Sequence, residues 1–130
     1  MAKQDCAAEL IVRCFEARTQ AHLFHLRAIQ NSYALHMALQ SFYEEIVGLT
    51  DNFAEGFQGV YGLIKSYPDA DKLDPPVGQP TPEIMLQSLR KWIMAERDDI
   101  GTTDDSEIQN NIDEIVSLID ATLYKVRFLK

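Results

Sequence analysis

Positive charge is scarce in this sequence, and the shortage limits what the protein can bind. Twelve Lys and Arg residues stand against twenty Asp and Glu residues, which gives a formal net charge of −8 at pH 7. Nucleic acids and anionic membranes attract proteins through a basic face, so this balance argues against DNA and membrane surfaces as partners. An acidic balance suits a solvated helical surface and also an interior that attracts cations, and charge alone does not choose between these.

Long apolar runs are also missing. No stretch reaches the roughly 20 apolar residues that span a membrane, so we expect no membrane-spanning segment. The first residues, MAKQDCAAEL, lack the pattern of a signal peptide, and the expected location is therefore the cytoplasm. Gly-rich phosphate loops, nucleophile elbows and zinc-finger spacings are absent as well, so no catalytic residue and no organic cofactor site is predicted.

Cysteine is limited to Cys6 and Cys14. On one helix these two residues lie about 12 Å apart along the axis, whereas a disulfide needs Cα atoms within roughly 7 Å. We therefore expect two reduced, buried thiols, as is usual in a cytosolic protein.

The alternation of apolar and polar residues that marks a β-strand does not occur either. Apolar residues instead recur at helical spacing in four blocks, at about residues 5–30, 33–65, 82–100 and 106–130. Thr81 is a typical helix N-cap before Pro82 at the first helical position. Ser32 or Asn31 can cap the second block. With 130 residues, the chain is predicted to be one all-α domain over residues 1–130.

The connections between the blocks predict how the helices are joined. The first and third connections are short, and short turns join antiparallel neighbours. The second connection, SYPDADKLDPPVGQPTP at residues 66–82, is proline-rich and long enough to cross the length of a bundle. A long crossover between helices two and three permits the ferritin-like four-helix bundle, and we predict that fold.

All three histidines lie between His22 and His36, on either side of the first turn. If that turn is centred between Gln30 and Asn31, His25 and His36 are opposite each other in an antiparallel hairpin. His22 lies one helical turn further from the loop and can share a face with His25. The hairpin therefore predicts a cluster of imidazoles near one end of the bundle.

Two carboxylates that can grip a metal ion, Asp51 and Glu55, follow on the second helix at positions i and i+4. Asp51 lies about 22 Å from His36 along the helix axis, so one chain cannot combine the histidines and the carboxylates in one site. Across a two-fold interface between antiparallel copies the two sets can meet. Burial of the carboxylates would favour a metal site, because uncompensated buried charge is costly, and exposure would favour a solvated surface. The alternative for His25, His36, Asp51 and Glu55 is a polar cluster in a helix interface whose members are satisfied by hydrogen bonds.

The second block, ALHMALQSFYEEIVGLTDNFAE, resembles the second helix of the Dps family, the DNA-binding proteins from starved cells. The family pattern is His, three residues, Asp, ten residues, Asp, three residues, Glu, and His36, Asp51 and Glu55 match it in type and spacing. AHLFHL resembles the family's first-helix element, with His25 in the place of the histidine, and NIDEIVSLIDATLYKVRFL resembles the closing helix. The resemblance covers most of residues 15–62 and 105–129.

The resemblance implies a di-iron ferroxidase site between two subunits, with histidines from one subunit and carboxylates from the other. It implies His25, His36, Asp51 and Glu55 as iron ligands. It further implies a homo-oligomer, which in that family is a twelve-subunit shell that oxidises ferrous iron, often with peroxide, and stores the ferric mineral.

The sequence departs from the family at two places. Gln40 stands where the family has its first Asp, and a neutral amide is a weak iron ligand, so the site loses a charge. Only Lys3 precedes the first helix, so the basic tail with which many members bind DNA is missing, and DNA binding is not expected.

A second resemblance is to small uncharacterised ferritin-like proteins encoded by tailed phages and bacteria, which share the patterns SYA-H-AL--FYEE and QG-YG. That resemblance carries no established activity. The sequence therefore leaves two function classes open. One is a Dps-like iron-binding protein that oxidises Fe(II) between subunits. The other is a non-catalytic ferritin-fold structural or interaction protein, encoded by a phage, with a degenerate metal site.

Overall fold

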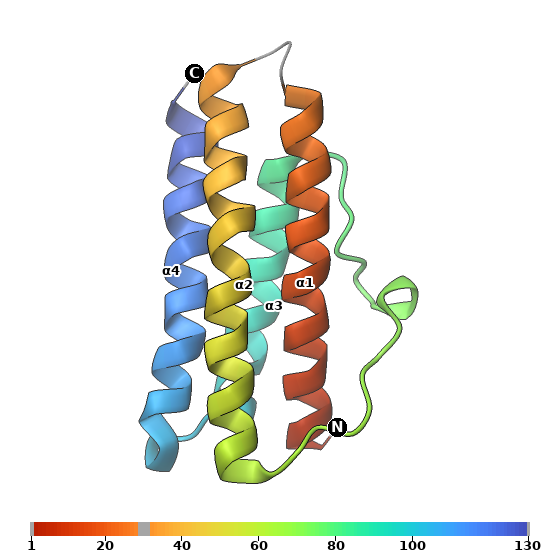
Figure 1. The fold of residues 1–130 in the computed structure, drawn as a ribbon, viewed down its shortest axis with the longest axis vertical. Helices are drawn as coiled ribbons and strands as arrows, with labels where there is room; N and C mark the ends of the chain where they lie inside the picture. Colours follow the sequence, from red (N-terminus) through yellow and green to blue (C-terminus); the bar gives the residue numbers. More distant parts are fainter. Residues whose placement is uncertain (1, 29–31, 130) are drawn as a thin grey trace.

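The computed structural model describes residues 2–28 and 32–129, and these residues form four α-helices and no strand (Figure 1). The helices and two short 3-10 turns are α1 (Lys3–Arg27), α2 (Tyr33–Tyr61), η2 (Ala70–Lys72), α3 (Pro82–Ile100), η3 (Thr103–Asp105) and α4 (Ser106–Phe128). The all-α prediction is confirmed. None of these helices combines the length and the apolar character needed to cross a membrane.

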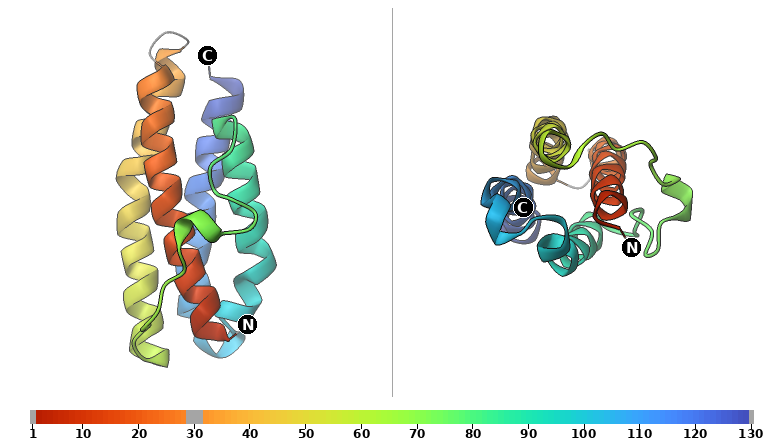
Figure 2. Two further views of the ribbon diagram at one scale, coloured as in Figure 1. Left: turned by 90° about the vertical axis from the view of Figure 1, so that its right-hand side faces the viewer. Right: turned by 90° about the horizontal axis from the view of Figure 1, so that it is seen from below.

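The four helices stand side by side around one core. Helix α1 packs against α2 and α3, and α4 packs against the same two helices from the other side. Each of these contacts joins antiparallel neighbours, as the colour gradients in Figure 1 and in the side view of Figure 2 show. The connection from α2 to α3 runs along the outside of α1 from one end of the bundle to the other (Figures 1 and 2).

Local sequence signals account for the starts of α2 and α3. The Thr81 hydroxyl accepts a hydrogen bond from the Ile84 N–H at 3.2 Å, which confirms the predicted cap of α3. At α2 the Ser32 hydroxyl accepts from the Leu35 N–H at 3.1 Å, so Ser32 is the cap. The predicted extension of the first helix to Gln30 and the alternative cap Asn31 fall outside the described residues.

The prediction that the second helix continues to residue 65 is wrong. Helix α2 ends at Tyr61, and Gly62 follows with φ = 92° and ψ = 170°. Only glycine adopts this backbone region readily, because a side chain there would collide with the backbone. Gly62 therefore stops the helix and turns the chain into the long connection.

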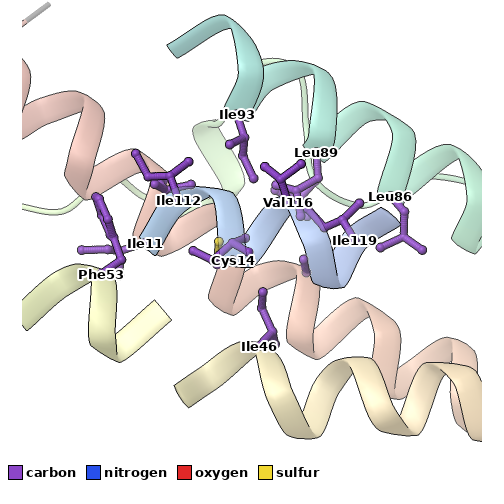
Figure 3. Packing of buried hydrophobic residues seen from close by; sticks show 14 of the residues in the cluster. Ile11, Cys14, Ile46, Phe53, Leu86, Leu89, Ile93, Ile112, Val116 and Ile119 are labelled. Atoms are coloured by element: carbon purple, nitrogen blue, oxygen red, sulfur yellow. The ribbon is translucent and has the colours of Figure 1, made fainter. Parts of the chain in front are cut away.

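The core consists of one apolar stripe from each helix. Figure 3 shows Ile11 and Cys14 of α1 packed among side chains of the other three helices, which include Ile46, Phe53, Leu86, Leu89, Ile93, Ile112, Val116 and Ile119. Full burial of each large apolar side chain contributes about 1.5–3 kcal/mol. Both cysteines are buried, as predicted, and burial raises the pKa of the Cys14 thiol to about 12.

Arg13 holds the long connection against α1. Its side chain is only 2% exposed, and its Nη1 donates a hydrogen bond to the Pro75 carbonyl at 2.8 Å. Its Nε donates to the Glu9 carboxylate at 2.8 Å, and its guanidinium lies 4.7 Å from the centre of the Trp92 ring. One buried cation thus joins α1, the connection and α3, which keeps the crossover in place along the bundle.

A paired-histidine candidate metal site

The end of the bundle where α1 finishes and α2 begins brings His25 and His36 face to face. Their rings are stacked, with centroids 3.6 Å apart and planes 18° from parallel. This is the pairing that the hairpin geometry predicts. His25 is buried, at 6% exposure, and His36 is half-buried.

The two rings are fixed by reciprocal hydrogen bonds to the opposite backbone. Nδ1 of His25 donates to the His36 carbonyl at 2.7 Å, and Nδ1 of His36 donates to the His25 carbonyl at 3.0 Å. A carbonyl oxygen can only accept, so each Nδ1 carries the proton. In the neutral ring this leaves a lone pair on each Nε2.

This arrangement is the usual one for metal-binding histidines, in which the nitrogen that does not bind the metal donates to a carbonyl or carboxylate. The stacking places the two Nε2 atoms on neighbouring rings. The same hydrogen bonds also stabilise the helix pair, by about 0.5–1.5 kcal/mol each. The geometry therefore suits half of the ligand set of a metal site. It is also explained by the packing of the two helices without any metal.

His22 lies beside this pair, with its ring edge to face with that of His25 and the centroids 5.9 Å apart. It is exposed, and its ring stacks on Tyr43 with centroids 4.2 Å apart and planes 15° from parallel. Tyr43 in turn meets His25 edge to face at 5.3 Å. Tyr43 follows His36 by seven residues, a spacing that places both on one face of α2.

Asp51 and Glu55 are exposed on α2, well along the helix from the histidines. Exposure of these carboxylates in the single chain fits a solvated helix face, and it also leaves them accessible to another copy. The Gln40 amide does not complete the site, since its Nε2 donates to the Glu44 carboxylate at 3.0 Å.

A complete ligand set is not assembled within one chain. Within residues 2–28 and 32–129, no three His, Cys, Asp or Glu side chains gather closely enough to hold a metal ion. The donors at the α1–α2 end are two imidazoles, and a metal ion bound there needs further ligands from water or a second copy. This agrees with the distance argument from the sequence, which separates the histidines from the carboxylates.

Comparison with known proteins gives one match. The family described as "Family of unknown function (DUF5856)" matches residues 25–126, a span that begins at His25 and includes Asp51 and Glu55. No curated protein and no solved structure matches the chain.

Proposed function

Because the chain belongs to the DUF5856 family, whose function is unknown, we propose a function from the histidine pair: an oligomeric, Dps-like protein that binds iron between subunits and oxidises Fe(II) there. The observation that carries the proposal is the reciprocal hydrogen bonding of His25 and His36, which uses Nδ1 of each ring and makes Nε2 the nitrogen that would bind a metal.

The arrangement of the helices supports a ferritin-like bundle. The α1–α2 and α3–α4 pairs are antiparallel, and the long connection between α2 and α3 returns the chain to the opposite end of the bundle (Figure 1). One long crossover with two short connections is the ferritin-like topology, in which metal sites are built from facing helices. The order of contacts around the bundle, α1 to α2 to α4 to α3, is consistent with that topology.

Oxygen ligands from a second copy would complete the site. Iron prefers a mixture of imidazole and carboxylate ligands, and the described part of one chain offers only imidazoles at the histidine pair. Asp51 and Glu55 are exposed on the same helix, about 22 Å further along the axis. A two-fold axis that packs the α1–α2 faces of two copies against each other in antiparallel fashion places one copy's carboxylates beside the other copy's histidines.

In this proposal iron is the substrate. Two Fe(II) ions each lose one electron, and with two protons they reduce one hydrogen peroxide molecule to two water molecules. His25 and His36 would orient the ion through Nε2, while Asp51 and Glu55 of the neighbouring copy would offset its charge. Gln40 adds no negative charge, so the second ion of a pair is held more weakly than the first.

Anaerobic titration with Fe(II), followed by peroxide and a measurement of ferric absorbance, tests the proposal. Binding of less than about one Fe(II) per pair of chains would contradict an interfacial site. If the proposal holds, two variants should lose Fe(II) binding. One carries His25→Ala and His36→Ala, and the other carries Asp51→Asn and Glu55→Gln. A monomeric mass for the wild-type protein would also contradict the proposal.

Mixing these two variants tests whether the site lies between copies. A mixed dimer contains one site that has lost all its ligands and one site in which every ligand is intact. Co-refolding equal amounts should therefore restore about a quarter of the wild-type sites, because half of the dimers are mixed. If both ligand sets act within one chain, the mixture stays inactive.

The second candidate is a non-catalytic ferritin-fold interaction protein, encoded by a phage, in which the site has degenerated. The exposed carboxylates and the Gln40–Glu44 hydrogen bond favour it, since neither ties a carboxylate to the histidines. An oligomeric protein that takes up no iron would support this candidate over the ferroxidase.

A further inference from the structure

A groove between α3 and α4 exposes aromatic and basic side chains. It has a volume of about 570 Å³, and the residues that line it include Arg90, Lys91, Met94, Tyr124, Arg127 and Phe128. We refer to it as the basic groove. Met94, Tyr124 and Phe128 are 45%, 57% and 69% exposed. Aromatic residues, Met and Arg are enriched at protein interfaces, so this composition is typical of a docking surface.

Two of the cations in the basic groove have partners at the surface. Arg90 lies 2.7 Å from Asp120, and Arg127 lies 3.6 Å from Glu83. All four side chains are substantially exposed, and such ion pairs are weak and easily exchanged. The groove still carries more basic than acidic side chains, although the chain as a whole has a net charge of −8.

A second groove, between α2 and α4, has the opposite charge. It has a volume of about 500 Å³ and is lined by Glu44, Glu45, Gly48, Leu49, Asn52 and Leu118. We refer to it as the acidic groove. Its described lining contains two carboxylates and no Lys or Arg, with two leucines beside them.

Gly48 lies in the middle of α2 and faces open space. A Cβ atom added to Gly48 would meet no atom within 4 Å among the described residues. A glycine inside a helix is less stable than an alanine, so a tolerated helical glycine usually allows close packing. Gly56 of the same helix shows such a contact, because its added Cβ would lie 3.2 Å from the Asn111 amide nitrogen. Gly48 therefore leaves a stretch of α2 surface with no side chain beside Glu44 and Glu45, where another molecule can approach the helix closely.

We propose that the basic groove of one copy docks into the acidic groove of the next copy. The exposed rings of Tyr124 and Phe128 would pack against the open surface at Gly48. The basic side chains would face Glu44 and Glu45. The two grooves carry opposite charge, and both combine apolar with charged lining residues.

The contact is head-to-tail, because it joins two different surfaces of the chain. It lies on the α4 side of α2, whereas the histidine pair lies between α2 and α1. Asp51 and Glu55 follow Gly48 by three and seven residues and so share a face of α2 with the acidic groove, whereas the basic groove contains none of the proposed iron ligands. Variants of the basic groove therefore allow loss of the contact and loss of metal binding to be measured separately.

Charge reversal tests the contact. One variant carries Lys91→Glu and Arg127→Glu, and the other carries Glu44→Lys and Glu45→Lys. Each variant alone should associate more weakly than the wild type by on the order of a hundredfold, since like charges would face each other. An equimolar mixture should associate again, because unaltered and doubly reversed grooves both pair correctly. Sedimentation equilibrium measures the mass in each case.

Three outcomes would overturn the proposal: a monomeric wild type, variants that keep the wild-type mass, or a mixture that fails to associate. Fe(II) binding by the Lys91→Glu, Arg127→Glu variant provides the independent readout, because none of the proposed iron ligands lines the basic groove. If this variant binds iron as the wild type does while its mass falls, the docking contact is supported and is separate from the iron site. If it loses iron and keeps its mass, the docking contact is refuted.

Gly48→Ala offers a test with no charge change, and Gly59→Ala is its matched control. Gly59 is also an exposed glycine of α2 with no described atom within 4 Å of an added Cβ, but it does not line the acidic groove. Both substitutions should raise the melting temperature of the dissociated chain through helix propensity. Only Gly48→Ala should weaken association, by at least about tenfold. Equal association of the two variants would overturn the role of Gly48.

Discussion

Substitution of His36 by alanine and by asparagine separates the structural role of the ring from metal binding. Alanine removes one hydrogen bond, worth about 1 kcal/mol, and the stack on His25, worth about 0.5–1.5 kcal/mol. The His25 carbonyl keeps a partner, because it also accepts from the Ala28 N–H. The better helix propensity of alanine returns up to about 0.5 kcal/mol. The expected net loss is therefore about 1.5 kcal/mol.

Asparagine should recover part of this loss. Its amide nitrogen occupies nearly the same place as Nδ1 of histidine and can donate the same 3.0 Å hydrogen bond to the His25 carbonyl. The stack is lost and Nε2 has no equivalent. His36→Asn should thus be destabilised by only about 1 kcal/mol, yet bind Fe(II) at least about tenfold more weakly than the wild type.

Urea unfolding at pH 7 measures the two stabilities, and anaerobic isothermal titration with Fe(II) measures the affinities. His22→Asn is the control, since His22 is an exposed neighbour of His25 that takes no part in the reciprocal hydrogen bonds. Wild-type affinity in His36→Asn would refute the role of Nε2 as a ligand. Unchanged stability in His36→Ala would refute the energetic argument for the pair.

Further substitutions test other parts of the structure. Arg13→Met should lower the free energy of unfolding by about 3–5 kcal/mol, measured by urea unfolding, because it leaves Glu9 without its buried partner and the Pro75 carbonyl without its donor. Gly62→Ala should cost about 1–3 kcal/mol in the same assay, since φ = 92° strains any side chain, whereas Gly59→Ala should not destabilise. Arg97 lowers the pKa of Asp113 in the folded protein, chiefly by hydrogen bonding. The pair therefore stabilises the fold at pH values above the pKa that Asp113 has in the unfolded chain. This stability is lost as the pH falls through the lower pKa that Asp113 has in the folded protein. Asp113→Asn should therefore show a smaller loss of melting temperature between neutral and acidic pH than the wild type, and the difference should be small because the pair is partly exposed.

Local pattern was sufficient to predict the helices and the histidine pair. Helical periodicity locates each apolar stripe, and the symmetry of an antiparallel hairpin places His25 opposite His36. The end of α2 was not predicted, because Gly56, Gly59 and Gly62 are equivalent in the sequence. Only the tertiary path of the chain after Tyr61 requires a positive φ, and it requires it at Gly62.

Contacts between distant segments were beyond sequence reasoning. Arg13 reads as an ordinary helix-surface residue, yet Pro75 and Trp92, far along the chain, enclose it. The hydrogen bonds that fix the ring nitrogens were also unpredictable, since spacing gives the level of a residue but not the direction of its polar atoms. The spacing of Asp51 and Glu55 predicts that they share one face of α2. It does not predict which residues they face, because that depends on how copies of the chain assemble.

The two proposed contacts together imply more than a dimer. A two-fold contact through the α1–α2 faces joins two copies and no more, because it buries the same surface of both copies. A head-to-tail contact on the α4 side adds further copies, and it gives a ring or a filament by itself. When both operate, pairs are joined into a closed shell if the angles allow. Charge reversal in the basic groove should then reduce the shell to dimers that retain His25 and His36 opposite Asp51 and Glu55. Dimers that bind Fe(II) but retain no ferric mineral after peroxide treatment would place iron binding in the two-fold contact and iron retention in the head-to-tail contact.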